Sequence, residues 1–351
     1  MISTSMNIGL TGLQTAQKVV DMLSHNIANA DTPGYRRLEN HNYEINFSGP
    51  DNNPFLPAGV GTTIETATVP WVDLRYLDAL KDNGYNEAVN DGLGKYASVV
   101  DDNQLSDSFT KFMSAAHDLQ YNPTNLSVHE QFDQAGQNFV DNLNRVDNLF
   151  QQAQESIVQV KSLSQIELDT IQERLSKLAS ENPTDGVVTE INYLKQRVSQ
   201  LTGTISGYND VLQSIIPPIL ATYQAIKEEV VAGVNDSYGE NIITGGSGQY
   251  GWTYVLGGDA VKLTEFGNQK FNHQIGALKT KVGAMMSTAE NALAYGQSDL
   301  AASSSAYSDA YGVDLADQAV KMAQYQRFYE ANAAAVRVAD GLIGTLLNIF
   351  E

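Results

Sequence analysis

HNIANADTPGYRR, residues 25–37, is the stretch that decides how the chain leaves its first helix. The side chains of Asn26 and Asn29 can hydrogen-bond backbone groups where a helix ends. Pro33 and Gly34 then force the chain out of helix into a turn. An ordinary helix stop would explain the Pro-Gly pair, but not the two asparagines that precede it.

The residues after the turn have a chemistry that suits docking. Tyr35 offers a flat apolar body with a polar tip, and Arg36 and Arg37 offer guanidinium forks for carboxylates. We therefore expect this corner to fix the direction of the chain and to dock these three side chains on neighbouring subunits. If so, errors at the corner should spoil assembly and leave the rest of the chain stable.

Both ends of the chain have apolar residues at coiled-coil spacing. Residues of the N-terminal seam recur every three or four places: Met6, Leu10, Leu13, Ala16, Val20, Leu23, Ile27 and Ala30. The C-terminal seam consists of Leu315, Met322, Tyr329, Val336, Ile343 and Phe350, with Tyr325, Ala339 and Leu346 beside them. Two ordinary surface helices remain an alternative. However, chain ends are usually frayed and polar, so ends this regularly apolar indicate a partner, either each other or another subunit.

The middle of the chain predicts a helical bundle with small β elements. Residues 38–94 read as a connector with a β-hairpin and the start of a helix over about 73–119. Heptads over 132–160 and 191–215 predict an elongated antiparallel bundle within 95–311, in which one helix stops at Pro217-Pro218. A glycine-rich β element is expected at about 241–275, followed by a helix over about 271–296 and a terminal helix within 312–351. The predicted fold class is mainly α.

Charge narrows the possible partners. The chain has 21 Lys and Arg against 41 Asp and Glu, a formal net charge of −20. Residues 1–37 hold three basic and two acidic groups, and residues 312–351 hold three basic and five acidic groups, so the acidity lies in the middle. Phosphate backbones and anionic lipids should repel such a chain, so we expect neither nucleic-acid binding nor membrane insertion. No secretory signal and no transmembrane stretch are recognisable.

No constellation in the sequence predicts catalysis, a cofactor or a metal. Cysteine is absent, the five histidines show no metal-ligand spacing, and there is no nucleophile elbow. Gly246 to Gly251 spell a dinucleotide fingerprint, but the following residues alternate like a strand where the fingerprint needs a helix. We therefore expect a glycine-rich turn. A nucleotide-binding enzyme is kept only as a remote alternative.

The two ends together resemble bacterial flagellar rod, hook and hook-associated proteins. SHNIANADTPGYRR is similar to their N-terminal signature, and GVDLADQAVKMAQYQRFYEANAAAVRVADGLIGTLLNIF to their C-terminal helix. The signature residues that match are Asn26, Ile27, Ala28, Asn29, Thr32, Pro33, Gly34, Tyr35 and Arg36. The resemblance implies that residues 3–30 and 314–350 pack coaxially as an inner tube, so that 1–37 and 312–351 form one terminal domain.

Within this group, the long helical middle resembles the FlgK family of hook-associated proteins. That resemblance implies a non-enzymatic structural role at the hook–filament junction, outside the cell. It also implies partners: further copies of the chain, hook protein, a second junction protein, flagellin, the flagellar type III export apparatus and an export chaperone. The outer β domains usual in that family are expected to be missing after residue 215, because only QSIIPPILA intervenes. A rod or hook subunit is the alternative.

Overall fold

The protein is mainly α-helical, which confirms the predicted fold class. A computed structural model describes residues 2–46, 57–246, 249–266 and 268–350. The chain divides into two compact units. Unit 1 comprises Met1–Leu77, Glu173–Arg197 and Ala301–Glu351, and unit 2 comprises Asp78–Gln172 and Val198–Leu300.

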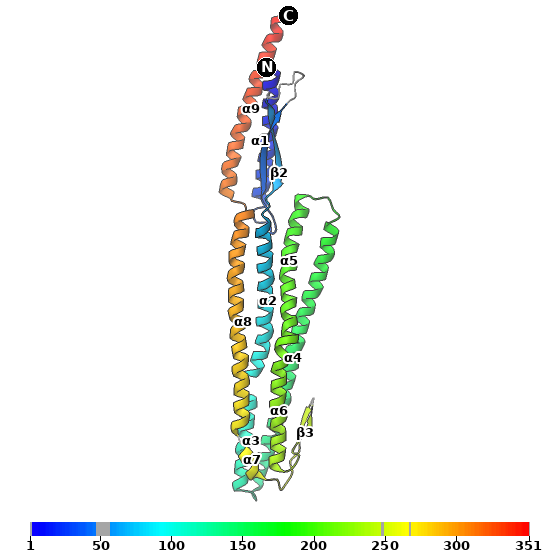
Figure 1. Cartoon of the computed structure of the whole chain (residues 1–351), viewed down its shortest axis with the longest axis vertical. Helices are drawn as coiled ribbons and strands as arrows, with labels where there is room; N and C mark the ends of the chain where they lie inside the picture. The colour runs from blue at the N-terminus through cyan, green and yellow to red at the C-terminus, as the bar shows by residue number, and fades with distance from the viewer. Residues whose placement is uncertain (1, 47–56, 247–248, 267, 351) are drawn as a thin grey trace. The chain divides into compact units, whose positions relative to one another are not determined.

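Four long helices each have residues in both units (Figure 1). In chain order the elements are α1 (Ile2–Ala28), β1 (Leu38–Asn46), β2 (Pro57–Thr66), α2 (Pro70–Val100), α3 (Gln104–Tyr121), α4 (Leu126–Leu178), α5 (Asp185–Asp210), the π-helical turn η1 (Val211–Ile215), α6 (Ile216–Tyr238), β3 (Ile243–Gly246), β4 (Gln249–Trp252), α7 (Ala260–Phe266), α8 (Asn268–Tyr311) and α9 (Leu315–Phe350).

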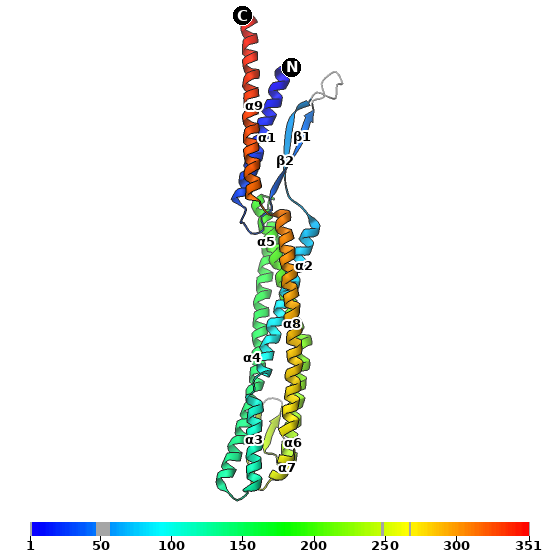
Figure 2. The ribbon, with the colours of Figure 1, turned by 90° about the vertical axis from the view of Figure 1, so that its left-hand side faces the viewer.

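The terminal helices α1 and α9 of unit 1 lie side by side and run in opposite directions (Figure 2). Gly9 near the start of α1 contacts Val336 near the end of α9, whereas Asn26 at the end of α1 reaches Gln318 at the start of α9. Val19, Met22 and Leu23 form a small core with Met322 and Tyr325 of α9. The two chain ends therefore meet within one unit.

The hairpin of β1 and β2 packs on α1. The strands pair antiparallel from Leu38 opposite Thr66 onwards. The hydroxyl of Thr15 donates to the carbonyl of Val60 at 2.8 Å. A Cβ at Gly59 would lie 2.0 Å from Oγ1 of Thr11, so only glycine permits this close approach. The hairpin, predicted as part of a connector, thus belongs to the same unit as the terminal helices.

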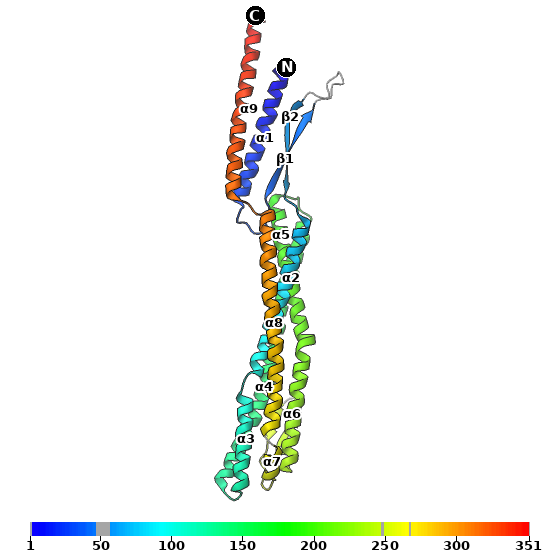
Figure 3. The same cartoon turned by 60° about the vertical axis from the view of Figure 1, so that its left-hand side comes forward.

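Unit 2 is built on a large apolar core shared by its helices. Phenylalanines from three helices meet in it: Phe109 of α3, Phe139 of α4 and Phe271 of α8 lie with ring centroids 4.5 to 6.1 Å apart. These rings come from the heptads and amphipathic patterns of the sequence, whose apolar stripes must be buried against one another. The α3–α4 connection can be followed in Figure 3.

The glycine-rich segment docks on α4 as a short hairpin. Asn144 of α4 both donates to the carbonyl and accepts from the N–H of Tyr250, at 2.9 Å each. Nε1 of Trp252 donates to Asp133 at 2.7 Å, and the indole lies where a Cβ of Gly136 would stand. The β structure ends at Trp252, so the predicted β element at 241–275 was too long. Residues 253–259 form a loop, and helices α7 and α8 follow from Ala260 onwards.

Three helix boundaries differ from the sequence prediction. The helix expected over 73–119 is broken at 101–103, where Oδ1 of Asp102 accepts from the N–H of Gln104 at 2.9 Å. The helix expected to end near 296 continues to Tyr311. Pro217-Pro218 does not end the helical run. The N–H of Ile216 bonds the carbonyl of Val211, five residues back, which makes a π turn. This wider turn makes room for the two proline rings, which have no N–H to donate and would clash in an α-helix.

Candidate assembly site

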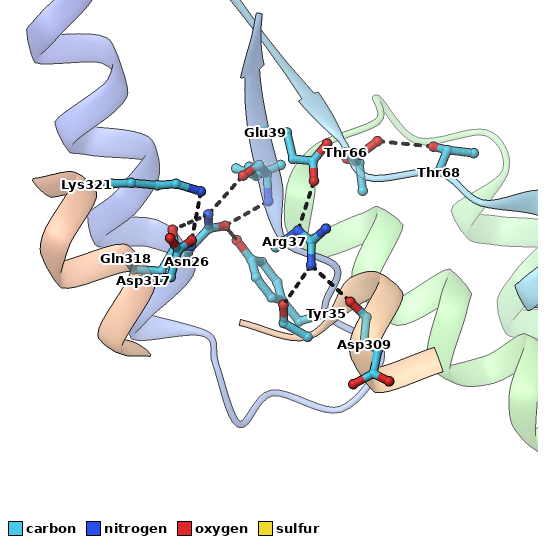
Figure 4. A network of polar contacts seen from close by, with 12 residues as sticks. Asn26, Tyr35, Arg37, Glu39, Thr66, Thr68, Asp309, Asp317, Gln318 and Lys321 are labelled. Carbon is cyan, nitrogen blue, oxygen red and sulfur yellow. Dashed lines mark hydrogen bonds and ion pairs between the residues drawn. The ribbon is translucent and has the colours of Figure 1, made fainter. Parts of the chain in front are cut away.

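Asn26 is the centre of the corner where α1 ends (Figure 4). Its Nδ2 donates to the carbonyl of Leu38 at 2.9 Å and to Oε1 of Gln318 at 3.0 Å. Its Oδ1 accepts from the hydroxyl of Tyr35 at 2.7 Å and from the N–H of Leu38 at 2.8 Å. Asn26 is fully buried, and these four bonds satisfy both ends of its amide. One side chain therefore joins α1, the corner, β1 and α9.

Tyr35 is held inside the corner. It is 9% exposed, and the 3.3 Å contact of its hydroxyl with Nδ1 of His25 adds to the bond with Asn26. Burial and the nearby carboxylate of Asp185 raise the pKa of Tyr35 to about 12. The phenol therefore stays protonated and remains a donor at neutral pH.

The turn itself is of type II. The N–H of Tyr35 bonds the carbonyl of Thr32 at 3.0 Å, with Pro33 and Gly34 at the two central positions. Gly34 has φ +78°, and its missing Cβ would lie 2.6 Å from the carbonyl oxygen of Thr189 in α5. The turn consequently needs glycine for its backbone angle and for its close contact with α5.

Arg36 makes a bidentate ion pair with Asp73 at the start of α2, at 2.5 and 3.1 Å. Its guanidinium also lies 4.3 Å from the ring centroid of Tyr311 and bonds the hydroxyl of Tyr307 at 3.4 Å. Burial tends to lower the pKa of Arg36, but Tyr307, Asp73 and Tyr311 outweigh it and the pKa is raised. Arg37 pairs with Glu39 at 2.9 Å.

These contacts correct the expectation that Tyr35 and both arginines dock on neighbouring subunits. All three are engaged by the chain's own residues in unit 1. Asn26 binds the hydroxyl of Tyr35, and Asp73 and Tyr307, far away in sequence, hold Arg36. Arg37 pairs with Glu39 and also donates to the carbonyl of Asp309. Sequence reasoning missed these partners. Nothing local marks Asp73 or Gln318 among the many acids and amides of the chain.

The corner and α5 enclose a groove of about 450 Å³ within unit 1. Its walls include the tyrosines 35 and 193, Pro33 and His25, together with the carboxylates of Asp185 and Glu190. Glu190 is paired with Arg174 at 2.6 Å. Asp185 has no ion-pair partner among the described residues, so the groove combines aromatic walls with an uncompensated negative charge.

The predicted seam residues fall into three groups. Ala16, Leu23 and Ala339 are buried in the chain itself. The half-buried members are Met6, Leu13, Val20, Ala30, Met322, Tyr325, Val336 and Ile343. Leu10, Ile27, Leu315, Tyr329 and Leu346 are exposed, and nothing is described of the side chain of Phe350.

Glycines that the hydrophobic pattern had overlooked form the line where α1 meets α9. A Cβ at Gly9 would lie 2.6 Å from Cγ2 of Val336, and one at Gly12 would lie 2.5 Å from Oδ1 of Asn332. A small-residue spacing of three places was the signal that could have found this line. Because the two glycines form the contact between α1 and α9, Leu10 and its apolar neighbours lie beside this contact and not within it.

The described residues offer no other site with recognisable chemistry. No group of three or more His, Asp and Glu side chains among them could hold a metal ion. The described helices include none that is both long and apolar enough to cross a membrane. Gly246 and Gly251 belong to the β3–β4 hairpin, and the next helix begins only at Ala260, which a dinucleotide fingerprint does not allow; Ser247 and Gly248 lie outside the described residues.

Both ends of the chain match families of flagellar axial proteins. A family described as flagella basal body rod protein matches residues 6–36, which cover α1 and the corner. A family described as flagellar basal body rod FlgEFG protein C-terminal matches residues 304–349, which cover the end of α8 and nearly all of α9. No curated protein and no solved structure was found to match the chain. Matches of this kind at both ends support a structural component of the flagellar axis, of rod or hook type.

Proposed function

We propose that the chain is a hook-associated protein of the FlgK type, which polymerises through α1 and α9 at the hook–filament junction. The observation that carries polymerisation is the apolar surface that the paired terminal helices leave uncovered. On α1 it includes Ile8, Leu10 and Ile27, which are 37%, 40% and 36% exposed. On α9 it includes Val320, Phe328, Tyr329, Val338, Leu342 and Leu346, which are 41% to 65% exposed.

Such a surface suits coaxial packing of many copies. Each exposed apolar side chain that a neighbouring copy covers would contribute on the order of 1 kcal/mol, because transfer from water is worth about 25 cal/mol per Å². Apolar side chains left exposed in this number on two neighbouring helices are typical of an interaction site. The exposed members of the predicted seam lie on this surface, so the seam serves contacts between copies as well as the α1–α9 pair.

The junction assignment is supported by unit 2. A hook-associated chain of this type is expected to have a long helical middle, and α4 alone runs for 53 residues. On this proposal the chain is exported through the flagellar type III apparatus with a chaperone. Outside the cell it then contacts hook protein below it, and a second junction protein and flagellin above it.

A rod or hook subunit is the second candidate, and both family matches favour it. The family that matches residues 6–36 is described as a basal body rod protein, and the family that matches residues 304–349 as a basal body rod FlgEFG protein C-terminal. The two candidates differ in where they act. Deleting the gene and imaging the flagella by electron microscopy separates them: hooks without filaments would support the junction role, and missing hooks or rods would support the alternative.

Assembly is tested by charges placed on the uncovered surface. Val338→Asp with Leu342→Asp changes side chains that are 65% and 52% exposed, so the isolated chain should keep its melting temperature within a few degrees. In a polymer the same charges would be buried without partners, and incorporation into flagella should be abolished. Leu256→Asp, 74% exposed on unit 2, is the matched control. Normal incorporation of the double variant would refute polymerisation through α9.

A further inference from the structure

The groove between the corner and α5 has a composition that selects for a guanidinium. Tyr35 and Tyr193 supply aromatic walls, and Asp185 supplies a carboxylate. A guanidinium stacks on aromatic rings and bonds carboxylates through a planar fork, whereas an ammonium is a compact and strongly hydrated charge. The surroundings add further negative charge, because Arg174 is shared between Glu190 at 2.6 Å and Glu181 at 3.8 Å.

Two arginines on α9 match this groove in charge and lack carboxylate partners. Arg327 and Arg337 are both exposed, and neither makes an ion pair with a described residue. Lys321, the other cation of α9, is already paired with Asp317 at 2.7 Å. One helix of the chain therefore presents uncompensated guanidinium groups, and one groove presents an uncompensated carboxylate.

The chain cannot satisfy this match by itself. Gln318 lies beside Asn26 at the corner, and α9 runs away from there along α1. At a rise of 1.5 Å per residue, Arg327 and Arg337 stand roughly 14 and 28 Å further along the helix. An arginine side chain of the same copy does not reach back over such distances, so the complementary surface belongs to another molecule.

We propose that the groove receives Arg327 or Arg337 from α9 of a second copy of this chain. The inference rests on the proposed polymerisation and adds the contact that sets the position of one copy against the next. The exposed apolar surface supplies attraction without direction, whereas an arginine seated between two rings and a carboxylate specifies a single register.

Disulfide trapping tests the contact directly, since the chain contains no cysteine. Gly186 lines the groove, and a Cβ there meets nothing within 4 Å, so Gly186→Cys is accommodated. The full chain bearing Gly186→Cys with either Arg327→Cys or Arg337→Cys replaces the wild type in a flagellated host, and isolated flagella are oxidised. One of the two pairs should give disulfide-linked copies, and each single-cysteine variant should give none.

Charge exchange provides the second arm. Asp185→Arg should reduce incorporation at least about tenfold, and combining it with Arg327→Asp or Arg337→Asp should restore most of it. Asp107→Arg is the matched control, because Asp107 also occupies the first turn of an exposed helix end but lies in unit 2.

The outcomes separate the two proposals. Wild-type chain absent from flagella would refute the proposed function, and this inference with it. Wild-type chain present in flagella, with neither cysteine pair linking copies and with normal incorporation of Asp185→Arg, would refute this inference alone. A disulfide that links the Gly186→Cys variant to a protein other than this chain, and that is lost in Asp185→Arg, would likewise overturn the assignment to a second copy.

Discussion

Gly34 shows how one residue can serve two requirements at the corner. Its φ of +78° costs an L-residue about 1–2 kcal/mol, and the carbonyl of Thr189 stands 2.6 Å from where a Cβ would be. Gly34→Ala should therefore loosen the contact with α5. We expect amides of residues 31–38 and 186–196 to lose at least about tenfold in hydrogen-exchange protection, which corresponds to 1.4 kcal/mol.

Gly186→Ala is the control for this prediction. Gly186 lies in α5, has open space around its Cβ and does not have a positive φ. Alanine should therefore stabilise the helix there by about 0.5–1 kcal/mol. Similar exchange for the two variants would mean that neither the backbone angle nor the α5 contact of Gly34 matters.

The corner separates what sequence can and cannot predict about a site. The Pro33-Gly34 turn follows from the intrinsic preferences of two adjacent residues, so the sequence was sufficient for it. The φ of +78° at Gly34 is what the second central position of such a turn requires. The partners Asp73 and Gln318 depend on long-range packing, which no local pattern encodes.

At the scale of elements, the α1–α9 pair depends on the absence of side chains. Gly9→Val would place a Cβ 2.6 Å from Cγ2 of Val336, and the branched side chain would drive the two helices apart. Amides of α9 around Asn332 and Val336 should then exchange at least about tenfold faster, because a strained contact of this kind costs 1–3 kcal/mol. Unit 2 should be unaffected.

Gly344→Ala provides the contrast on α9. Its Cβ meets nothing within 4 Å, so alanine should leave the pair intact and favour the helix. Unchanged exchange in Gly9→Val would contradict the close approach of α1 and α9. Hydrophobic periodicity predicted both helices correctly but pointed to the larger residues as the contact, because a glycine contributes nothing to a hydrophobic pattern.

In unit 2 too, the sequence predicted that helices form but not every detail of their geometry. The heptads over 132–160 and 191–215 predicted helices α4 and α5, since a repeating apolar stripe has to be buried by packing. Pro217-Pro218 misled the prediction because the rule against helix-interior proline assumes α-helical spacing, and η1 removes the clash by widening one turn.

For the whole molecule, buried phenols in both units link stability to alkaline pH. Burial raises the pKa of Tyr96 to about 12, and burial with nearby phenol and carboxylate groups raises that of Tyr238 to about 12. In unit 1, burial and the carboxylate of Asp185 likewise raise the pKa of Tyr35 to about 12. A phenol with a raised pKa in the folded state stabilises the fold fully below the unfolded value of about 10, and this stabilisation is lost as the pH rises through about 12.

Tyr96→Phe isolates this effect from other alkaline changes. The hydroxyl of Tyr96 is buried and bonds no described group, so its removal should be neutral or stabilising at pH about 7. Between about pH 10 and 12 the wild type must ionise or expose this phenol, and the variant need not. Urea unfolding across this range should show a smaller loss of unfolding free energy for Tyr96→Phe. Tyr35→Phe should instead lose stability already at neutral pH, because it deprives Oδ1 of Asn26 of a donor. If the pH profiles of wild type and Tyr96→Phe run parallel throughout, the buried phenol of Tyr96 does not contribute to alkaline unfolding. If instead the difference in unfolding free energy is constant below about pH 10 and changes only above it, ionisation of this phenol contributes to alkaline unfolding.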